Sequence, residues 1–175
     1  IIIDCARSSD ALENIKRVQR IIRNLPKKSF YIFFSSEAIK KSPKDSILPF
    51  RGDDYIREKK VLTNFLINKN NVAIVYPDIV FGKNGNWSKI VDKIIAAKVI
   101  EMPNEGNNGF NYIEINDLCN QIARSIQDDS IFLKEWRLTS KKRKWNSLTE
   151  KKVIKGSKNL YFDSFLKNFV VSILN

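Results

Sequence analysis

The 175-residue sequence contains no histidine, and this absence excludes several kinds of active site. Serine and cysteine hydrolases usually take their general base from a histidine, and most catalytic zinc sites use histidine ligands. Any general acid or base must therefore be a tyrosine, lysine, aspartate, glutamate or cysteine.

Cysteines and long apolar runs are also scarce. The two cysteines, Cys5 and Cys119, lie far apart and form no CxxC motif, so we expect neither a disulfide scaffold nor a metal site. No run approaches the roughly 18 apolar residues that a membrane helix needs. Segment 1–6 is too short, and too soon charged, for a signal peptide. These observations predict a cytoplasmic protein without a membrane partner.

Positive charge is abundant, with a net charge of +12 and its densest run at residues 141–144. Such charge can indicate nucleic-acid binding, and Trp136 and Trp145 on either side of the run could stack on bases. The lysines, however, are spread through a sequence that is also rich in asparagine and isoleucine. We interpret them as a solvated surface and do not expect a nucleic-acid partner.

Apolar runs and turn residues predict alternating strands and helices. The expected strands are 1–3, 30–34, 71–76, 98–102 and 112–115, and the expected helices are 10–24, 53–68, 87–97 and 116–126. Residues 40–52 and 103–111 are expected to be loops. The three isoleucines that open the sequence are typical of a strand buried on both faces.

This order predicts an α/β fold with a Rossmann-like, doubly wound parallel sheet. We expect a partial Rossmann-like catalytic domain at residues 1–126, of which 83–111 contribute to the substrate side. Residues 127–175 would form a small, basic α+β substrate-binding subdomain that ends in a helix at 160–174.

Tyr55 and Lys59 lie one turn apart on the predicted helix and so share one of its faces. An ammonium group close to a tyrosine favours the phenolate and brings its pKa, ordinarily near 10, towards neutrality. Ser36 follows the preceding strand, at the end where open α/β sheets bind ligands. The spacing of Tyr55 and Lys59 is by itself close to what chance would give.

Several segments give this pair a context, and they occur in a characteristic order. They are Ile2–Ala6, Phe34–Ile39, Tyr55-x-x-x-Lys59, Val72–Gly82 and Asn111–Leu118. Together they resemble the extended short-chain dehydrogenase/reductase family, which includes the nucleotide-sugar epimerases and dehydratases. The resemblance implies an NAD- or NADP-dependent epimerase, dehydratase or reductase that acts on a nucleotide sugar. It also implies a possible homodimer through the helix that carries Tyr55.

The resemblance also implies which residues do the chemistry. Tyr55 would exchange a proton with a sugar hydroxyl, Lys59 would assist Tyr55 and bind the nicotinamide ribose, and Ser36 would hydrogen-bond the reacting oxygen. The cofactor-binding residues would be Tyr55, Lys59, Tyr76, Pro77, Ile79 and Ala6.

Two departures from the family pattern leave an alternative open. None of the six glycines forms the Gly-rich GxxGxxG phosphate loop, which the family carries before the segment that matches Ile2–Ala6. We therefore expect an incomplete enzyme. In addition, Tyr76 replaces the arginine that usually precedes the proline of the Val72–Gly82 segment. The alternative is a non-catalytic relative that binds a nucleotide, RNA or a protein partner, and the missing phosphate loop and the basic C-terminal part favour it.

Overall fold

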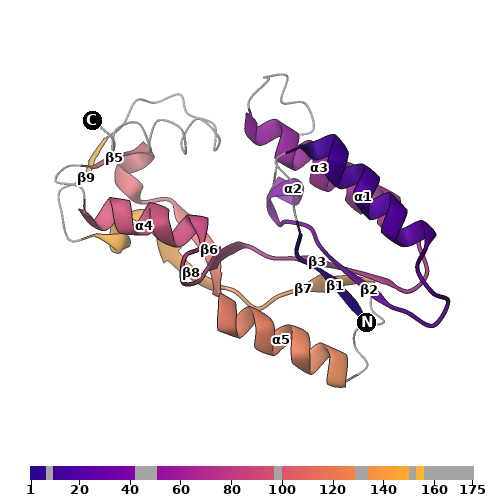
Figure 1. The fold of residues 1–175 in the computed structure, drawn as a ribbon. Helices are drawn as coiled ribbons and strands as arrows, with labels where there is room; N and C mark the ends of the chain where they lie inside the picture. Colours follow the sequence, from indigo (N-terminus) through magenta and orange to yellow (C-terminus); the bar gives the residue numbers. More distant parts are fainter. Residues whose placement is uncertain (7–9, 42–50, 97–99, 129–133, 150–152, 156–175) are drawn as a thin grey trace. The chain divides into compact units, whose positions relative to one another are not determined.

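The protein is described from a computed structural model (Figure 1). The described residues are 1–6, 10–41, 51–96, 100–128, 134–149 and 153–155. The chain forms two compact units. Unit 1 comprises Ile1–Asp78 and Cys119–Leu138, and unit 2 comprises Ile79–Leu118 and Thr139–Asn175. These units differ from a simple division near residue 126, because the chain passes between them three times.

Unit 1 is built on a four-stranded, wholly parallel sheet in the order β1-β2-β3-β7. Its strands are β1 (Ile2–Asp4), β2 (Tyr31–Phe34), β3 (Val72–Tyr76) and β7 (Glu135–Arg137). Its helices are α1 (Ala11–Arg23), α2 (Ala38–Lys41) and α3 (Arg51–Leu66), and α5 (Ile115–Gln127) begins in unit 2 and continues into unit 1. The predicted βαβ alternation and parallel sheet are therefore confirmed.

The core of unit 1 follows from the two-residue period of its strands. Tyr31 and Phe33 of β2 lie in one cluster with Val72, Ile74 and Tyr76 of β3. Helices α1 and α3, side by side in Figure 1, cover this face of the sheet and add Val18, Leu62 and Leu66 to the cluster. All eight side chains are at most 4% exposed, and burial of a large apolar side chain contributes about 1.5–3 kcal/mol.

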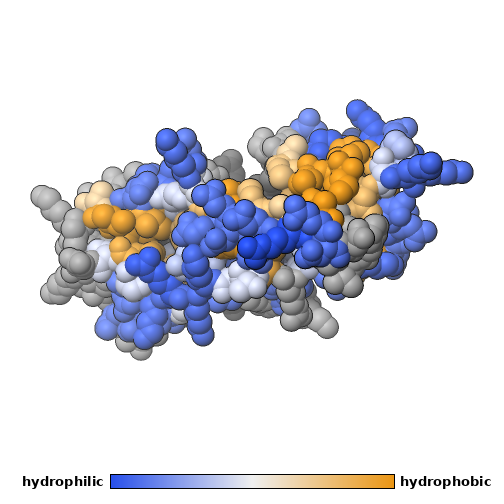
Figure 2. Space-filling model, turned by 90° about the horizontal axis from the view of Figure 1, so that it is seen from below, coloured by the Kyte–Doolittle hydropathy of each residue, from blue (hydrophilic) through white to orange (hydrophobic). Residues whose placement is uncertain are grey.

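Strand β1 corrects one prediction. Its isoleucines were expected to be buried on both faces, but Ile1, Ile2 and Ile3 are 61%, 38% and 47% exposed. The reason is topological: among the described strands β1 lies at the edge of its sheet and pairs only with β2. Figure 2 shows hydrophobic side chains reaching the surface of unit 1.

Unit 2 contains a three-stranded mixed sheet and a small second sheet. The first comprises β4 (Ile79–Phe81), β6 (Gly109–Glu114) and β8 (Lys141–Lys144), and β8 runs antiparallel to β6. The second pairs β5 (Ile100–Met102) with β9 (Val153–Lys155). Helix α4 (Asn86–Ala96) and two short 3-10 helices, Pro103–Gly106 and Trp145–Leu148, complete the described part.

The core of unit 2 includes one of the two tryptophans that flank the basic run. Trp145 is 4% exposed, and its ring stacks on Phe110 with 4.1 Å between the ring centroids. Ile94 and Leu148 belong to the same cluster. The Trp145 ring is therefore part of the core of unit 2. It is not available to stack on a base, which is the role that the sequence pattern left open.

Other differences between prediction and structure are local. A short helix, α2, occupies the start of the expected 40–52 loop, whose residues 42–50 lie outside the described residues. The expected helix at 160–174 also lies outside them. Strand β4 was not expected, since Pro77 precedes it and breaks the apolar pattern. Among the described helices, none has the length and apolar character needed to cross a membrane.

Candidate functional site

The candidate site lies at the carboxyl edge of the unit 1 sheet. Because β1, β2, β3 and β7 are all parallel, their carboxyl ends lie at one edge, which is where open α/β sheets bind ligands. Tyr76 ends β3, and Ser36 follows the end of β2 by two residues. Ala6 lies two residues beyond β1. The predicted site residues Ala6, Ser36 and Tyr76 therefore lie at the same edge of the sheet.

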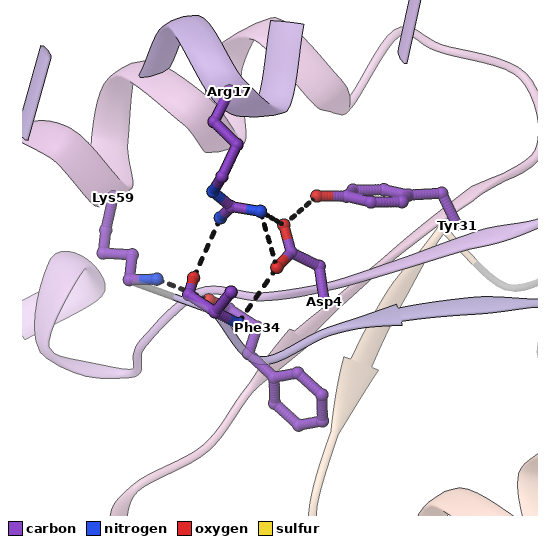
Figure 3. Close-up of polar contacts among 6 residues, drawn as sticks. Asp4, Arg17, Tyr31, Phe34 and Lys59 are labelled. Atoms are coloured by element: carbon purple, nitrogen blue, oxygen red, sulfur yellow. Dashed lines mark hydrogen bonds and ion pairs between the residues drawn. The ribbon is translucent and has the colours of Figure 1, made fainter. Parts of the chain in front are cut away.

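Helix α3 brings Tyr55 and Lys59 to the same edge. The Lys59 ammonium donates a hydrogen bond of 2.8 Å to the carbonyl oxygen of Phe34, the last residue of β2 (Figure 3). It lies 5.8 Å from the centroid of the Tyr55 ring and 4.8 Å from that of Phe33. Tyr55 is half-buried. The structure thus places the predicted pair on one face of α3, with its ammonium group fixed at the end of β2.

The two serines after β2 have different surroundings. Ser35 is 3% exposed, and its hydroxyl is hydrogen-bonded to that of Thr63 on α3 at 2.8 Å. Ser36 is half-buried, and its hydroxyl oxygen accepts a hydrogen bond of 3.2 Å from the backbone N–H of Ala38. Accepting that bond uses a lone pair and leaves the hydroxyl hydrogen of Ser36 able to donate. Ser35 therefore joins β2 to α3, whereas Ser36 can still contact another molecule.

Tyr76 and Pro77 are held within unit 1 by polar contacts of their own. The Tyr76 hydroxyl donates to a carboxylate oxygen of Glu135 at 2.5 Å, and the Lys40 ammonium lies 3.6 Å from the centroid of the Tyr76 ring. Burial, together with the hydrogen bond to Glu135, raises the pKa of Tyr76. The carbonyl of Pro77 accepts a hydrogen bond from the backbone N–H of Glu37 at 3.1 Å. The side chain of Tyr76 is thus held within unit 1 by Glu135 and Lys40, and its predicted contact with a nicotinamide remains a prediction.

The last predicted cofactor residue, Ile79, belongs to unit 2. It begins β4 and pairs with Tyr112 of β6 in the parallel sense. Its predicted contact with a nicotinamide remains a prediction.

A buried polar network that the sequence did not predict lies beside the candidate pair (Figure 3). Asp4, 8% exposed, accepts hydrogen bonds to both carboxylate oxygens from Nη1 of Arg17, each of 2.9 Å. The Tyr31 hydroxyl donates to the same carboxylate, and burial and this bond raise the pKa of Tyr31. The backbone N–H of Ala6 also donates to Asp4, at 3.1 Å, and its carbonyl accepts from Nη2 of Arg17 at 2.8 Å.

The segment after β1 is therefore held in place through both the N–H and the carbonyl of Ala6. No role was predicted for Asp4 from the sequence. The available signal was an aspartate directly after three isoleucines, because a carboxylate next to a core strand needs a cationic or hydrogen-bonding partner.

Cys5 lies within this segment but does not have the character of a nucleophile. Burial and the neighbouring Asp4 carboxylate raise the pKa of the Cys5 thiol, so it is protonated at neutral pH. Within the described part of the chain, no group of three or more acidic or cysteine side chains is arranged to hold a metal ion. The chemistry available at this edge is that of a phenol, an ammonium group and a hydroxyl.

Comparison with known proteins gives a match in structure only. No family model matches the sequence, and no curated protein does. RMD from Pseudomonas aeruginosa, complexed with NADPH, gives a TM-score of 0.59 at 11% identity over 90% of this chain and 67% of its own. UDP-N-acetylglucosamine 4-epimerase from Methanobrevibacter ruminantium M1 gives a TM-score of 0.56 at 16% identity, over 86% of this chain and 56% of its own. Gre2 from Candida albicans gives a TM-score of 0.55 at 14% identity, over 99% of this chain and 75% of its own.

The fold is Rossmann-like. At these identities the likeness establishes the fold alone, in agreement with the parallel sheet of unit 1 and the mixed sheet of unit 2. The chain spans 56% to 75% of the length of these three structures. It spans 37% of the length of CapF from Staphylococcus aureus, another structural match.

Proposed function

We propose that this chain is the catalytic part of an NAD(P)-dependent epimerase, dehydratase or reductase that acts on a nucleotide-activated sugar. The observation that carries the proposal is the position of Lys59, hydrogen-bonded to the end of β2 and one helical turn from Tyr55. That arrangement places a phenol and an ammonium group at the ligand-binding edge of a Rossmann-like sheet. A hydroxyl with a free hydrogen, that of Ser36, belongs to the same strand end.

In this proposal each residue has a separate task. Tyr55 exchanges a proton with a sugar hydroxyl, and the positive charge of Lys59 stabilises the phenolate that forms. The hydroxyl of Ser36 donates to the reacting oxygen and orients it. A bound nicotinamide would supply or accept hydride, as in other nicotinamide-dependent enzymes. Ala6 and the backbone of Tyr76 and Pro77 would line its binding site.

The fixed backbone of two of these segments fits such a role. Ala6 is held by Asp4 and Arg17, and Pro77 by Glu37, so neither segment would need to be ordered when a ligand binds. Binding sites whose walls are fixed in advance lose less entropy on association. The structural matches include a protein complexed with NADPH and a nucleotide-sugar epimerase, which supports this choice of cofactor and substrate class.

The test is substitution of Tyr55 by phenylalanine in the full-length protein. Turnover of UDP-N-acetylglucosamine and other nucleotide sugars is followed by chromatography of the sugar product and, for a reductase, by nicotinamide absorbance. Since a general acid or base contributes about 100- to 10,000-fold, Tyr55→Phe should lower kcat by that factor. Tyr112→Phe, a change of the same size on β6 of unit 2, is the matched control and should retain activity. Undiminished turnover in Tyr55→Phe would exclude Tyr55 as the acid or base.

The second candidate is a non-catalytic relative that binds a nucleotide. It is favoured by the lack of a GxxGxxG phosphate loop in the 175 residues. The same assay separates the two: binding of NADPH or a nucleotide sugar without any turnover, equal in the wild type and in Tyr55→Phe, would support the non-catalytic function.

A further inference from the structure

A hollow in unit 1 lies at the opposite edge of the sheet from the candidate site. It has a volume of about 350 Å³, and its walls come from the end of α1, the segment before β2, the end of α3 and the segment before β3. Since α1 leads into β2 and α3 into β3, these walls stand at the amino ends of both strands. The cavity is therefore separate from Tyr55 and Lys59 at the carboxyl edge.

The charges around this cavity are all of one sign. Among the residues that the structure describes, Arg23, Lys27 and Lys69 line it, and no aspartate or glutamate does. Within the described part of the chain, none of these three cations forms an ion pair. Like charges gathered around one hollow repel one another, and an anion placed among them would remove that cost. These three residues are exposed, so the hollow presents accessible positive charge to a negatively charged group.

The remainder of the wall is apolar. Ile22, Leu25, Pro26 and Phe65 contribute to it, all from α1, α3 and the segment after α1. The Lys69 ammonium lies 5.0 Å from the centroid of the Phe65 ring, a distance at which the ring face attracts a cation. Apolar walls with a few convergent charged groups are typical of sites for small organic ligands. The wall therefore favours an anion that carries an apolar body over a bare inorganic ion.

The cavity is also held in shape by its own backbone. Asn71 has a left-handed conformation, with φ of 58°, which asparagine adopts more readily than most residues other than glycine. Its side-chain amide donates to the carbonyl of Lys27 at 3.1 Å, and its carbonyl accepts from the N–H of Tyr31 at 2.8 Å. These bonds tie the segment before β2 to the segment before β3. The two walls are therefore fixed relative to each other.

We propose that this cavity binds a small organic anion, namely a phosphate or carboxylate attached to an apolar or aromatic body. The anionic group lies among Arg23, Lys27 and Lys69, and the apolar body packs on Phe65 and Pro26. This site is independent of the proposed catalysis, because none of its residues is among those assigned to the reaction.

The experiment is isothermal titration of the full chain with three probes: phenyl phosphate, inorganic phosphate and benzyl alcohol. Phenyl phosphate should bind at least about tenfold more tightly than either of the others, because only it satisfies both the charges and the apolar wall. Benzoate is titrated in parallel, and tighter binding of phenyl phosphate or of benzoate identifies which anionic group the site prefers. Binding should weaken as salt is added.

Variants locate the binding. The double variant Arg23→Gln/Lys69→Gln should weaken phenyl phosphate binding at least about tenfold, since it removes two of the three cations that line the cavity. The control is Lys16→Gln/Arg20→Gln, which removes the same charge from exposed positions of α1 outside the cavity. Equal weakening in both double variants would overturn the proposal, as would equal affinity for inorganic phosphate or for benzyl alcohol.

Discussion

The buried contact between Asp4 and Arg17 allows a sharp test of the structure through the substitution Asp4→Asn. The change keeps the size of the side chain and removes its charge. The Asp4 side chain is 5% exposed and that of Arg17 is 32% exposed, so the guanidinium would lose its ionic partner in a mostly buried setting. The Tyr31 hydroxyl and the N–H of Ala6 donate to different oxygens of the Asp4 carboxylate, and an amide keeps only one of them. The substitution therefore removes a hydrogen-bond acceptor as well as the charge.

The magnitude follows from this geometry. Removal of one member of a buried ion pair costs about 3–5 kcal/mol, because the other charge is left uncompensated. Arg17 is partly exposed and can be rehydrated, so we expect a cost below that range, about 2–3 kcal/mol. Arg17→Met should cost a similar amount, since it leaves the Asp4 carboxylate buried. The double variant should cost less than the sum, with a coupling energy of about 1–3 kcal/mol.

The assay is urea unfolding combined with amide hydrogen exchange. Exchange is followed separately for peptides that contain β2 of unit 1 and β6 of unit 2, since the two units need not unfold together. The faster exchange should be confined to unit 1. The matched control is Asp92→Asn, on the exposed side of α4, which should change stability by less than about 0.5 kcal/mol. If Asp4→Asn destabilises no more than this control, or if the cycle shows no coupling, the network in Figure 3 is wrong.

Three further predictions concern the same unit. Ser35→Ala should lower the free energy of unfolding in urea by about 1–3 kcal/mol, because it leaves the buried hydroxyl of Thr63 without its partner. Ser36→Ala should lower it by less than about 1 kcal/mol but should reduce the kcat of the proposed reaction. A larger loss of stability in Ser36→Ala than in Ser35→Ala would contradict the roles assigned to the two serines. Since the pKa values of Tyr31 and Tyr76 are raised on folding, the stability that they contribute is complete below about pH 10 and is lost as the pH rises further. In a pH titration followed by ultraviolet absorbance, Tyr31 and Tyr76 should therefore ionise only when the protein unfolds. Ionisation of all five tyrosines before unfolding would refute the burial of these two. Cys5, whose thiol pKa is raised, should react with iodoacetamide at neutral pH more slowly than a free cysteine derivative does, and a faster reaction would contradict that assignment.

Much of the fold could be predicted from the sequence, since the relevant signals are local. Apolar runs that end in serine or proline located β2 and β3, and the period of the apolar residues located α1 and α3. The exposure of the isoleucines in β1 could not be predicted in this way. A run of isoleucines indicates a strand that prefers to be buried. Its actual exposure depends on whether other strands flank β1 in the sheet.

The candidate site was predictable in part for a similar reason. The spacing of Tyr55 and Lys59 is a property of one helix, and the structure confirms that they share a face. The hydrogen bond from Lys59 to Phe34 joins residues 25 positions apart, and the Tyr31 contact with Asp4 joins residues 27 apart. Such contacts arise when the crossover brings α3 and β2 back to the end of β1, and no periodicity in the sequence encodes that arrangement.

The two edges of the unit 1 sheet differ in how their charges are satisfied. At the carboxyl edge the ammonium of Lys59 is bound to a backbone carbonyl, and Arg17 is paired with Asp4. At the amino edge Arg23 and Lys69 line a cavity whose wall, as far as the described residues form it, includes no carboxylate. A ligand at the first edge must therefore be recognised by neutral hydrogen-bonding groups and a shared ammonium, whereas a ligand at the second must supply the negative charge itself. The two proposals consequently fail independently: Tyr55→Phe should leave phenyl phosphate binding unchanged, and Arg23→Gln/Lys69→Gln should leave hydride transfer unchanged.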